Sequence, residues 1–255
     1  MKNNIDGSEP TQTETGTIRK AGKKRKFTAI DRILLVLATL MFLGAMVLFA
    51  WTPVQNYLRD QRTKNLISSI EEGNPTIIVK MDELPINGEE YESYETFVLP
   101  TAEGTDPQPT LAPIDLPEDV VLTAFGMIKI EKIDLYIPLL DDAGVVPLRY
   151  GAGIQVNTAL PGEEGNSVIL GHRMKAYGSL FNRLDEVAIG DTIEITKVDG
   201  TVITYIVDEV IPKLDPAELL DYIDINAGYG VQVTLVTCTP TGVGSHRLLV
   251  IGHMA

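Results

Sequence analysis

The one cysteine of the chain ends an apolar run, where an enzyme could hold a thiol nucleophile. Cys238 follows residues 231–237, VQVTLVT, and has polar neighbours in Thr237, Thr239 and Pro240. The end of a strand presents a side chain at the rim of a sheet on a rigid support. A free cysteine is more commonly a buried core side chain, and a single cysteine excludes an intramolecular disulfide. The local sequence alone therefore leaves both a catalytic thiol and a structural thiol open.

Two further residues could complete a site with this thiol. His172 closes the apolar run SVIL at 167–170, and Arg247 opens the run HRLLV nine residues after Cys238. A free thiol is mostly protonated at neutral pH, and a neighbouring histidine can take or donate its proton. If the loop 239–246 joins two adjacent strands, the guanidinium of Arg247 faces the thiol and could hold a developing oxyanion. An isolated histidine or arginine is more often structural, so the prediction of a catalytic site rests on the three residues together.

Short apolar runs separated by Gly and Asp predict the strands that must hold these residues. Asp199-Gly200 between two alternating runs indicates a hairpin, and Gly178–Val187 is expected to form one short helix. Strands this short and numerous favour a mainly β fold, an antiparallel or mixed barrel, over a βαβ fold. The predicted strands are Met127–Ile130, Leu135–Leu139, Ser167–Leu170, Thr192–Lys197, Val202–Val210, Val231–Thr237 and Arg247–Ile251.

An uncharged stretch near the N-terminus predicts a membrane anchor. Ile33–Trp51 is 19 residues long, just enough to cross the hydrocarbon core as a helix. Residues 1–32 hold eight of the 21 basic and four of the 35 acidic side chains, which leaves 13 basic and 31 acidic after them. This asymmetry places the N-terminus in the cytoplasm by the positive-inside rule. A cleaved signal peptide is the alternative, but no small-x-small cleavage site precedes Thr52-Pro53.

The composition of the remaining segments predicts the domain organisation. Met81–Asp119 carries eleven acidic residues, no basic ones and six prolines, which is typical of an extended spacer. A body this acidic would repel a phosphate backbone, so nucleic acid is excluded as a partner. The predicted parts are a cytoplasmic basic tail at 1–29, a transmembrane signal anchor at 30–52, a juxtamembrane helical segment at 53–80, the acidic spacer at 81–120 and a catalytic domain at 121–255.

Three segments of the predicted domain resemble the sortases, a family of cysteine transpeptidases. TLVTCTPTGVGSHRLLV resembles the TLxTC signature with arginine on the next strand, and NSVILGHRMKAYGSLFNRLDEVAIGD resembles the segment that carries the catalytic histidine. GMIKIEKIDLYIPLL resembles the opening strands of the family. The resemblance spans residues 121–255.

The resemblance implies an eight-stranded barrel behind one N-terminal transmembrane helix, on the surface of a Gram-positive cell. It implies cleavage of an LPxTG-like sorting signal and transfer of the acyl group to an amine on a cell-wall precursor or a pilin lysine. Cys238 would be the nucleophile, His172 the general acid and Arg247 the clamp on the transition state. Thr237 and Thr239 would contribute to the substrate pocket. The implied partners are secreted surface proteins or pilins with a C-terminal sorting signal, and the membrane.

The subclass and some alternatives stay open. TCTPxGxxxHRLLV resembles most the pilin-polymerising class C enzymes, but Gln108 follows Asp106-Pro107 where these usually carry an aromatic lid residue. A class D- or E-like enzyme and an open groove therefore stay open as alternatives. An extracellular cysteine hydrolase or a non-catalytic peptide-binding barrel would use the same groove. No cofactor is predicted: zinc-motif spacing is missing among the Cys and His residues, and no dense ligand loop supports calcium.

Overall fold

The structure, a computed structural model, describes residues 28–80, 119–173, 180–223 and 230–255, and its chain divides into two compact units. In the first unit, Met1–Trp51, the long helix α1 begins at Ala29; it ends at Glu71 in the second unit. Its first 22 residues, Ala29–Ala50, have a mean hydropathy of 2.7, and none of these residues is buried. By length and composition, this part of α1 can cross a membrane.

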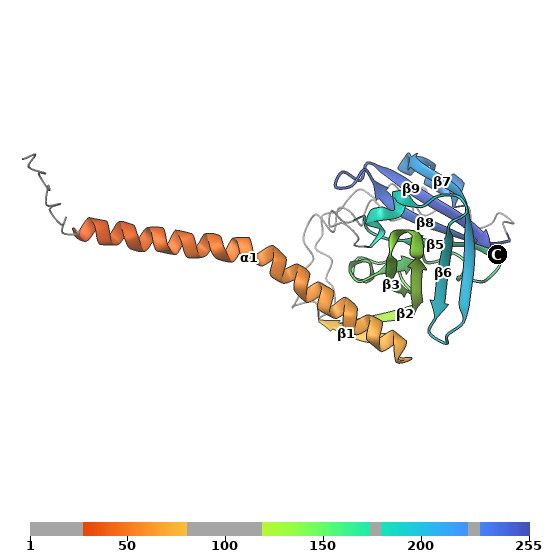
Figure 1. The fold of residues 1–255 in the computed structure, drawn as a ribbon, viewed down its shortest axis with the longest axis horizontal. Coiled ribbons are helices and arrows are strands. Elements are labelled where there is room, and N and C mark those ends of the chain that lie inside the picture. The colour runs from red at the N-terminus through yellow and green to blue at the C-terminus, as the bar shows by residue number, and fades with distance from the viewer. Residues whose placement is uncertain (1–27, 81–118, 174–179, 224–229) are drawn as a thin grey trace, which may run out of the picture. The chain divides into compact units, whose positions relative to one another are not determined.

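The second unit, Thr52–Ala255, is a closed β-barrel (Figure 1). Its sheet has the order β1-β2-β3-β4-β5-β8-β9-β7-β6, and a further pairing of β2 with β6 closes the eight strands from β2 to β6 into a ring. The pairs β3–β4 and β5–β8 are parallel and the others antiparallel. The strands are β1 Thr76–Lys80, β2 Asp119–Ile130, β3 Leu135–Leu140, β4 Ala152–Ile154, β5 Gly165–Leu170, β6 Thr192–Lys197, β7 Val202–Leu214, β8 Val231–Thr239 and β9 His246–Met254.

Alternation along the strands separates the inside of the barrel from its outer face. On β8, Val233 and Leu235 belong to the large apolar cluster that fills the barrel. Val236 belongs instead to a second cluster, against which Cys238 packs. The barrel is thus a packed core, and the candidate thiol lies on the outer face of its wall.

Short helices connect the strands and cover parts of the barrel. Phe181 and Leu184 of η4 belong to the cluster that fills the barrel. Leu219 in α3 and Ile223 just after it belong to the outer cluster beside Cys238. The short helices are η2 Glu131–Ile133, η3 Pro147–Arg149, η4 Phe181–Glu186, η5 Pro216–Glu218 and α3 Leu219–Tyr222.

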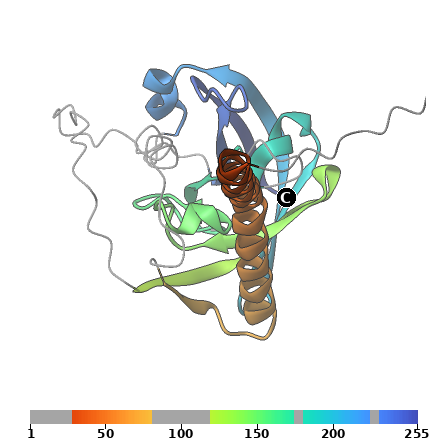
Figure 2. The same cartoon turned by 90° about the vertical axis from the view of Figure 1, so that its left-hand side faces the viewer.

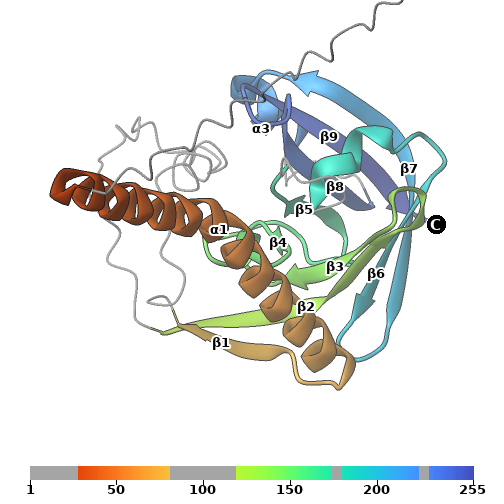
Figure 3. The same ribbon diagram turned by 60° about the vertical axis from the view of Figure 1, so that its left-hand side comes forward.

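The end of α1 and the strand β1 pack on another part of the outer surface. Leu66 and Ile70 on the helix and Val79 on β1 are buried in one cluster with side chains from β2 and β3. β1 pairs antiparallel with the start of β2, and the two strands lie side by side in Figures 2 and 3. Residues that precede the predicted spacer are therefore part of the folded unit.

The described structure agrees with most predicted elements and differs at three. Each predicted strand is present, and the start of the predicted juxtamembrane segment is helical, because α1 continues to Glu71. The segment 53–80 is not helical throughout, because 76–80 pair with β2 as the strand β1. The strand β4 was not predicted, and the helix expected over 178–187 is a 3-10 helix at Phe181–Glu186. The basic tail up to residue 27 and the spacer from 81 to 118 lie outside the described residues.

We expect Leu66→Ala to lower the free energy of unfolding of the barrel unit by about 2–5 kcal/mol, because it empties a fully buried position. Lys64→Ala, two residues earlier on an exposed position, is the matched control and should leave the stability nearly unchanged. Urea unfolding of the full chain in detergent micelles, followed by near-ultraviolet circular dichroism, measures both. Equal stability of the two variants would contradict the packing of α1 on the barrel.

Candidate active site

The pairing of β8 with β9 places Cys238 directly opposite Arg247. The two residues are cross-strand partners in the antiparallel register, and both alternate onto the outer face of the barrel. Cys238 is half-buried, whereas Arg247 is only 1% exposed. The Nη1 of Arg247 donates to the carbonyl oxygens of Gly244 at 2.9 Å and His246 at 3.1 Å. The guanidinium is therefore held in a fixed place beside the thiol.

The pairing of β5 with β8 brings His172 to the same rim. The two strands are parallel, and Leu170 is the register partner of Val236. The contact continues one residue further, since the amide of Gly171 donates to the carbonyl oxygen of Val236 at 3.1 Å. His172 and Cys238 each come two residues after the Leu170–Val236 pair. Both therefore lie at the same end of neighbouring strands.

The loop between β8 and β9 folds back over the thiol. The amide of Gly244 donates to the carbonyl oxygen of Pro240 at 3.0 Å, and Gly244 has φ of +67°, a conformation that favours glycine. A Cβ at this position would be 3.7 Å from the Sγ of Cys238, so the backbone of Gly244 lies against the cysteine. Arg247 binds the carbonyl of the same glycine, and this contact couples the loop to the guanidinium.

A buried apolar cluster adjoins the cysteine on the outer face of the barrel. It combines side chains of β5, β7, β8 and β9 with residues of the connections from β3 to β4 and from β7 to β8. Its buried members are Ala143, Leu148, Val168, Leu170, Leu214, Leu219, Ile223, Val236 and Leu249. Cys238 is partly buried and packs against this cluster.

Burial and charge act in opposite directions on the thiol. Desolvation raises the pKa of Cys238, and the positive charge of Arg247 lowers it by a smaller amount. Because burial dominates, the resting thiol is mainly neutral at neutral pH. A nucleophilic thiolate then needs a group that removes the proton, and the histidine at the same rim is of the right type for this.

The two threonines beside the cysteine form different hydrogen bonds. Thr237 is fully buried, and its Oγ1 donates to the carbonyl oxygen of Gly171 at 2.7 Å, which ties β8 to the residue before His172. Thr239 is half-buried, and its Oγ1 accepts a hydrogen bond from Arg173 at 2.9 Å. The predicted role of both in substrate binding stays a prediction. The buried position of Thr237 turns its hydroxyl away from the outer face.

Two contributors to the rim were not predicted from the sequence, namely Arg173 and the segment around Phe181. Arg173 bridges from the histidine segment to β8 and forms an ion pair with Asp185 on η4. Gly171 must be a glycine, because a Cβ there would lie 2.4 Å from the ring of Phe181. The signals were present in the sequence: arginine follows the histidine, and Phe181 and Asp185 are the first and last residues of FNRLD.

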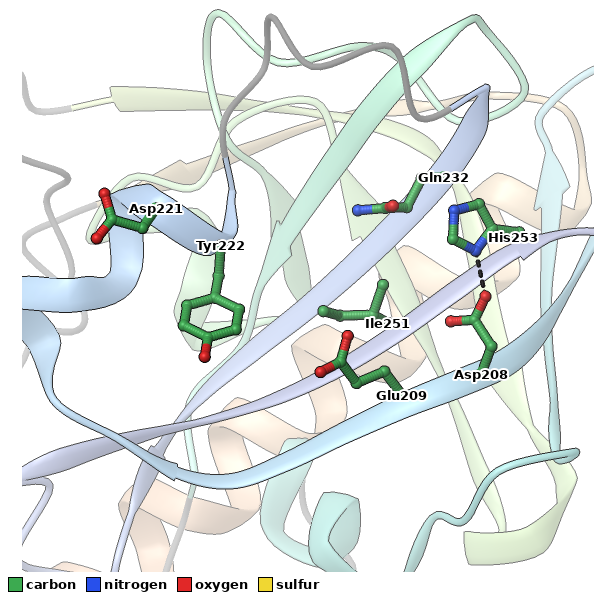
Figure 4. Close-up of a pocket in the computed structure, with 7 residues that line it drawn as sticks. All are labelled: Asp208, Glu209, Asp221, Tyr222, Gln232, Ile251 and His253. Atoms are coloured by element: carbon green, nitrogen blue, oxygen red, sulfur yellow. Dashed lines mark hydrogen bonds and ion pairs between the residues drawn. The ribbon is translucent and has the colours of Figure 1, made fainter.

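A separate hollow of about 360 Å³ lies at the other end of β8 and β9 (Figure 4). Gln232 and His253 line it, and they are six residues from Cys238 and Arg247 on the same strands, roughly 20 Å away. A bulge in β7 brings both Asp208 and Glu209 to this face, and Asp208 forms an ion pair with His253. The remaining lining residues are Asp221, Tyr222 and Ile251. The hollow is thus apart from the thiol.

His246 and His253, the two histidines of the chain other than His172, both belong to β9. His246 is the cross-strand partner of Thr239, whereas His253 lies at the far end of β9. Among the residues that the structure describes, no group of three or more His, Cys, Asp or Glu side chains could hold a metal ion.

The fold and the site together define a barrel protein with a thiol, an imidazole and a guanidinium at one rim. Residues 128–255, half of the chain, match the family model of the sortase domain. The chain therefore belongs to the sortase family.

Relatives of several subclasses are similar to the chain. It is 28% identical over 144 residues to sortase SrtE1 of Streptomyces coelicolor, a match that covers 51% of this chain and 40% of that protein. It is 34% identical to the crystal structure of Streptococcus agalactiae sortase C1, with a TM-score of 0.47, over 52% of this chain and 69% of that one. A Clostridium perfringens sortase D5 transpeptidase is 28% identical, with a TM-score of 0.46, over 52% and 79%. The chain thus spans less than half the length of its curated relative.

We expect Arg247→Gln to move the pH dependence of Cys238 alkylation to higher pH. Arg247 lowers the pKa of the thiol, so removing its charge leaves the opposing effect of burial alone and reduces the thiolate at a given pH. Arg247→Lys keeps the charge and should stay closer to the wild-type profile. The rate of alkylation by iodoacetamide as a function of pH measures both. A shift of the glutamine variant to lower pH would contradict the electrostatic account.

Proposed function

We propose that this chain is a membrane-anchored sortase that cleaves an LPxTG-like sorting signal through an acyl-enzyme on Cys238 and transfers the acyl group to an amine. The observation that carries the proposal is the register of three neighbouring strand ends, which gathers Cys238, His172 and Arg247 at one rim. Membership of the sortase family supports the reaction type.

The acylation step follows from the roles that these residue types can take. His172 removes the proton of the Cys238 thiol, and the sulfur attacks the carbonyl carbon of the scissile peptide bond. The carbonyl oxygen gains the negative charge, and the buried guanidinium of Arg247 stabilises it. The intermediate then collapses: the C–N bond breaks, the leaving amine takes the proton from His172, and a thioester remains on Cys238.

The transfer step reverses the same chemistry with a second amine. The incoming amine attacks the thioester carbonyl and gives its proton to His172. The C–S bond breaks, the sulfur of Cys238 takes that proton, and the new amide leaves. Water in place of the amine would make the enzyme a hydrolase, so the products decide between the two activities.

The sorting signal would lie on the outer face of the barrel, against Cys238. The buried apolar cluster beneath this face, which includes Val236, Leu170 and Leu249, gives the thiol a rigid support. The partners would be secreted surface proteins or pilins with a C-terminal sorting signal, and an amine on a cell-wall precursor or pilin lysine.

The apolar part of α1 supports a single-pass anchor in the plasma membrane. The segment Ala29–Ala50 is long and apolar enough to span it, and the basic residues before it favour a cytoplasmic N-terminus. The barrel would then be extracellular, where it meets secreted substrates as they emerge. Whether the enzyme builds pili or anchors proteins to the wall depends on which amine it accepts.

We expect Cys238→Ala to abolish product formation while the melting temperature stays close to the wild-type value, since the substitution removes one half-buried sulfur. The assay incubates the full chain in detergent with a panel of LPxTG-like peptides and excess amine and identifies products by mass spectrometry. A peptide joined to the amine supports the transpeptidase, and cleavage to a free acid alone supports the hydrolase. Persistent turnover by the alanine variant would exclude Cys238 as the nucleophile.

We expect Arg247→Lys to lower kcat/KM by an amount equivalent to about 3–4 kcal/mol, because a point charge does not reproduce the planar guanidinium. His172→Ala should be nearly as severe, since the leaving amine then lacks a proton donor. Steady-state kinetics on the best peptide of the panel measure both. The clamp role would be wrong if the lysine variant kept most of the wild-type kcat/KM.

A further inference from the structure

Arg173 joins three segments of the rim through three different nitrogen atoms. Its Nη1 donates to the Oγ1 of Thr239 at 2.9 Å, on the residue that follows Cys238. Its Nη2 lies 2.7 Å from the Oδ1 of Asp185, and its Nε donates to the carbonyl oxygen of Asn182 at 3.3 Å. The side chain is only 9% exposed. A bridge with this many directed contacts, largely shielded from water, is more rigid than an exposed ion pair.

The same residue is bonded to the histidine through the backbone. Arg173 directly follows His172 and forms an isolated antiparallel bridge with Leu180, the residue before η4. The amide of Phe181 donates to the carbonyl oxygen of His172 at 3.1 Å. The backbone hydrogen bonds thus connect the histidine segment to η4, and the side chain of Arg173 connects both to the end of β8.

We propose that Arg173 is a positioning residue that holds His172 and Cys238 in register for the reaction, an inference that rests on the proposed function. The parallel ladder between β5 and β8 ends at Gly171, before either reactive residue. Beyond that point, the side-chain contact from Arg173 to Thr239 continues the connection between the two segments. Arg173 acts through the residues on either side of the site and takes no part in bond making.

The chemistry of the contact requires arginine. A lysine has one nitrogen on a flexible stem, so it cannot hold a threonine hydroxyl, a carboxylate and a carbonyl oxygen in three fixed directions. Loss of the bridge keeps both the thiol and the imidazole in the protein, but their distance and orientation are then no longer fixed. Misplacement by about 1 Å can lower the rate of an oriented reaction by about 10²-fold.

Arg183 is a matched control, because it lies on η4, the helix that carries two of the partners of Arg173. Its side chain is 16% exposed and bonds to Glu186 and Asp134 and to the carbonyl oxygen of Ile133. These partners lie on η4 itself and at the end of η2. Arg183→Ala therefore removes a comparable guanidinium from the same region without touching the bridge to β8.

The first test compares Arg173→Ala, Arg173→Lys and Arg183→Ala in the full chain in detergent micelles. We expect both Arg173 variants to lower kcat by about 10²-fold with KM nearly unchanged, and Arg183→Ala to keep a kcat close to the wild-type value. All three melting temperatures are measured alongside. Equal losses of kcat in Arg173→Ala and Arg183→Ala, or an unchanged kcat in Arg173→Ala, would overturn the proposal.

A double-mutant cycle tests the bridge itself. Thr239→Val removes the acceptor of the Nη1 hydrogen bond, so its effect on kcat should vanish once Arg173 is already alanine. Fold-changes that multiply in the double variant would show independent roles and overturn the proposal.

A substrate-free measurement separates this inference from the proposed function. The pH profile of Cys238 alkylation is compared for the wild type, His172→Ala and Arg173→Ala. We expect Arg173→Ala to reproduce the change that His172→Ala makes, even if no peptide is ever joined to an amine. The positioning role would be overturned if either variant, Arg173→Ala or His172→Ala, had the same pH profile as the wild type.

Discussion

The hydrogen bonding of β8 to β5 on one side and to β9 on the other is the constraint on which the site depends. The parallel register with β5 brings the histidine segment to the cysteine, and the antiparallel register with β9 brings the arginine opposite it. A slip of β8 by one residue would turn Cys238 into the barrel, away from Arg247 on the outer face. The packed interior, which includes Val233, Leu235, Leu248 and Val250, prevents that slip, so the apolar core fixes the chemistry on the outer face.

The same packing sets the reactivity of the thiol. Half-burial of Cys238 raises its pKa, and Arg247 opposes this only in part, so the structure favours a protected neutral thiol at rest. The buried guanidinium is held by carbonyl oxygens of the loop that covers the sulfur. A charge held in this way is preorganised for an oxyanion and does not have to reorient during the reaction. In the proposed mechanism, protection of the thiol and stabilisation of the transition state therefore come from one arrangement.

Local pattern was enough to predict most strands of the barrel and to put Cys238, His172 and Arg247 at strand ends, but it could not predict how the strands pair. Alternation identified the long strands, whereas β4 has only the three residues Ala152–Ile154 and gives no period. TIIVK at 76–80 follows a helix and is a short apolar run, which periodicity cannot distinguish from more helix. The bridge from Arg173 to Thr239 joins residues 66 positions apart, so it depends on strand register that a single sequence does not contain.

The central claim, that Cys238 carries the acyl group, is tested most directly by trapping the intermediate. The full chain in detergent is mixed with an LPxTG-like peptide without amine, quenched in acid after short times, and mapped by mass spectrometry. The account predicts the mass of the N-terminal peptide fragment on Cys238, and its disappearance when an amine is added before the quench. Cleavage of the peptide with no adduct on Cys238, or with the adduct on another residue, would contradict it.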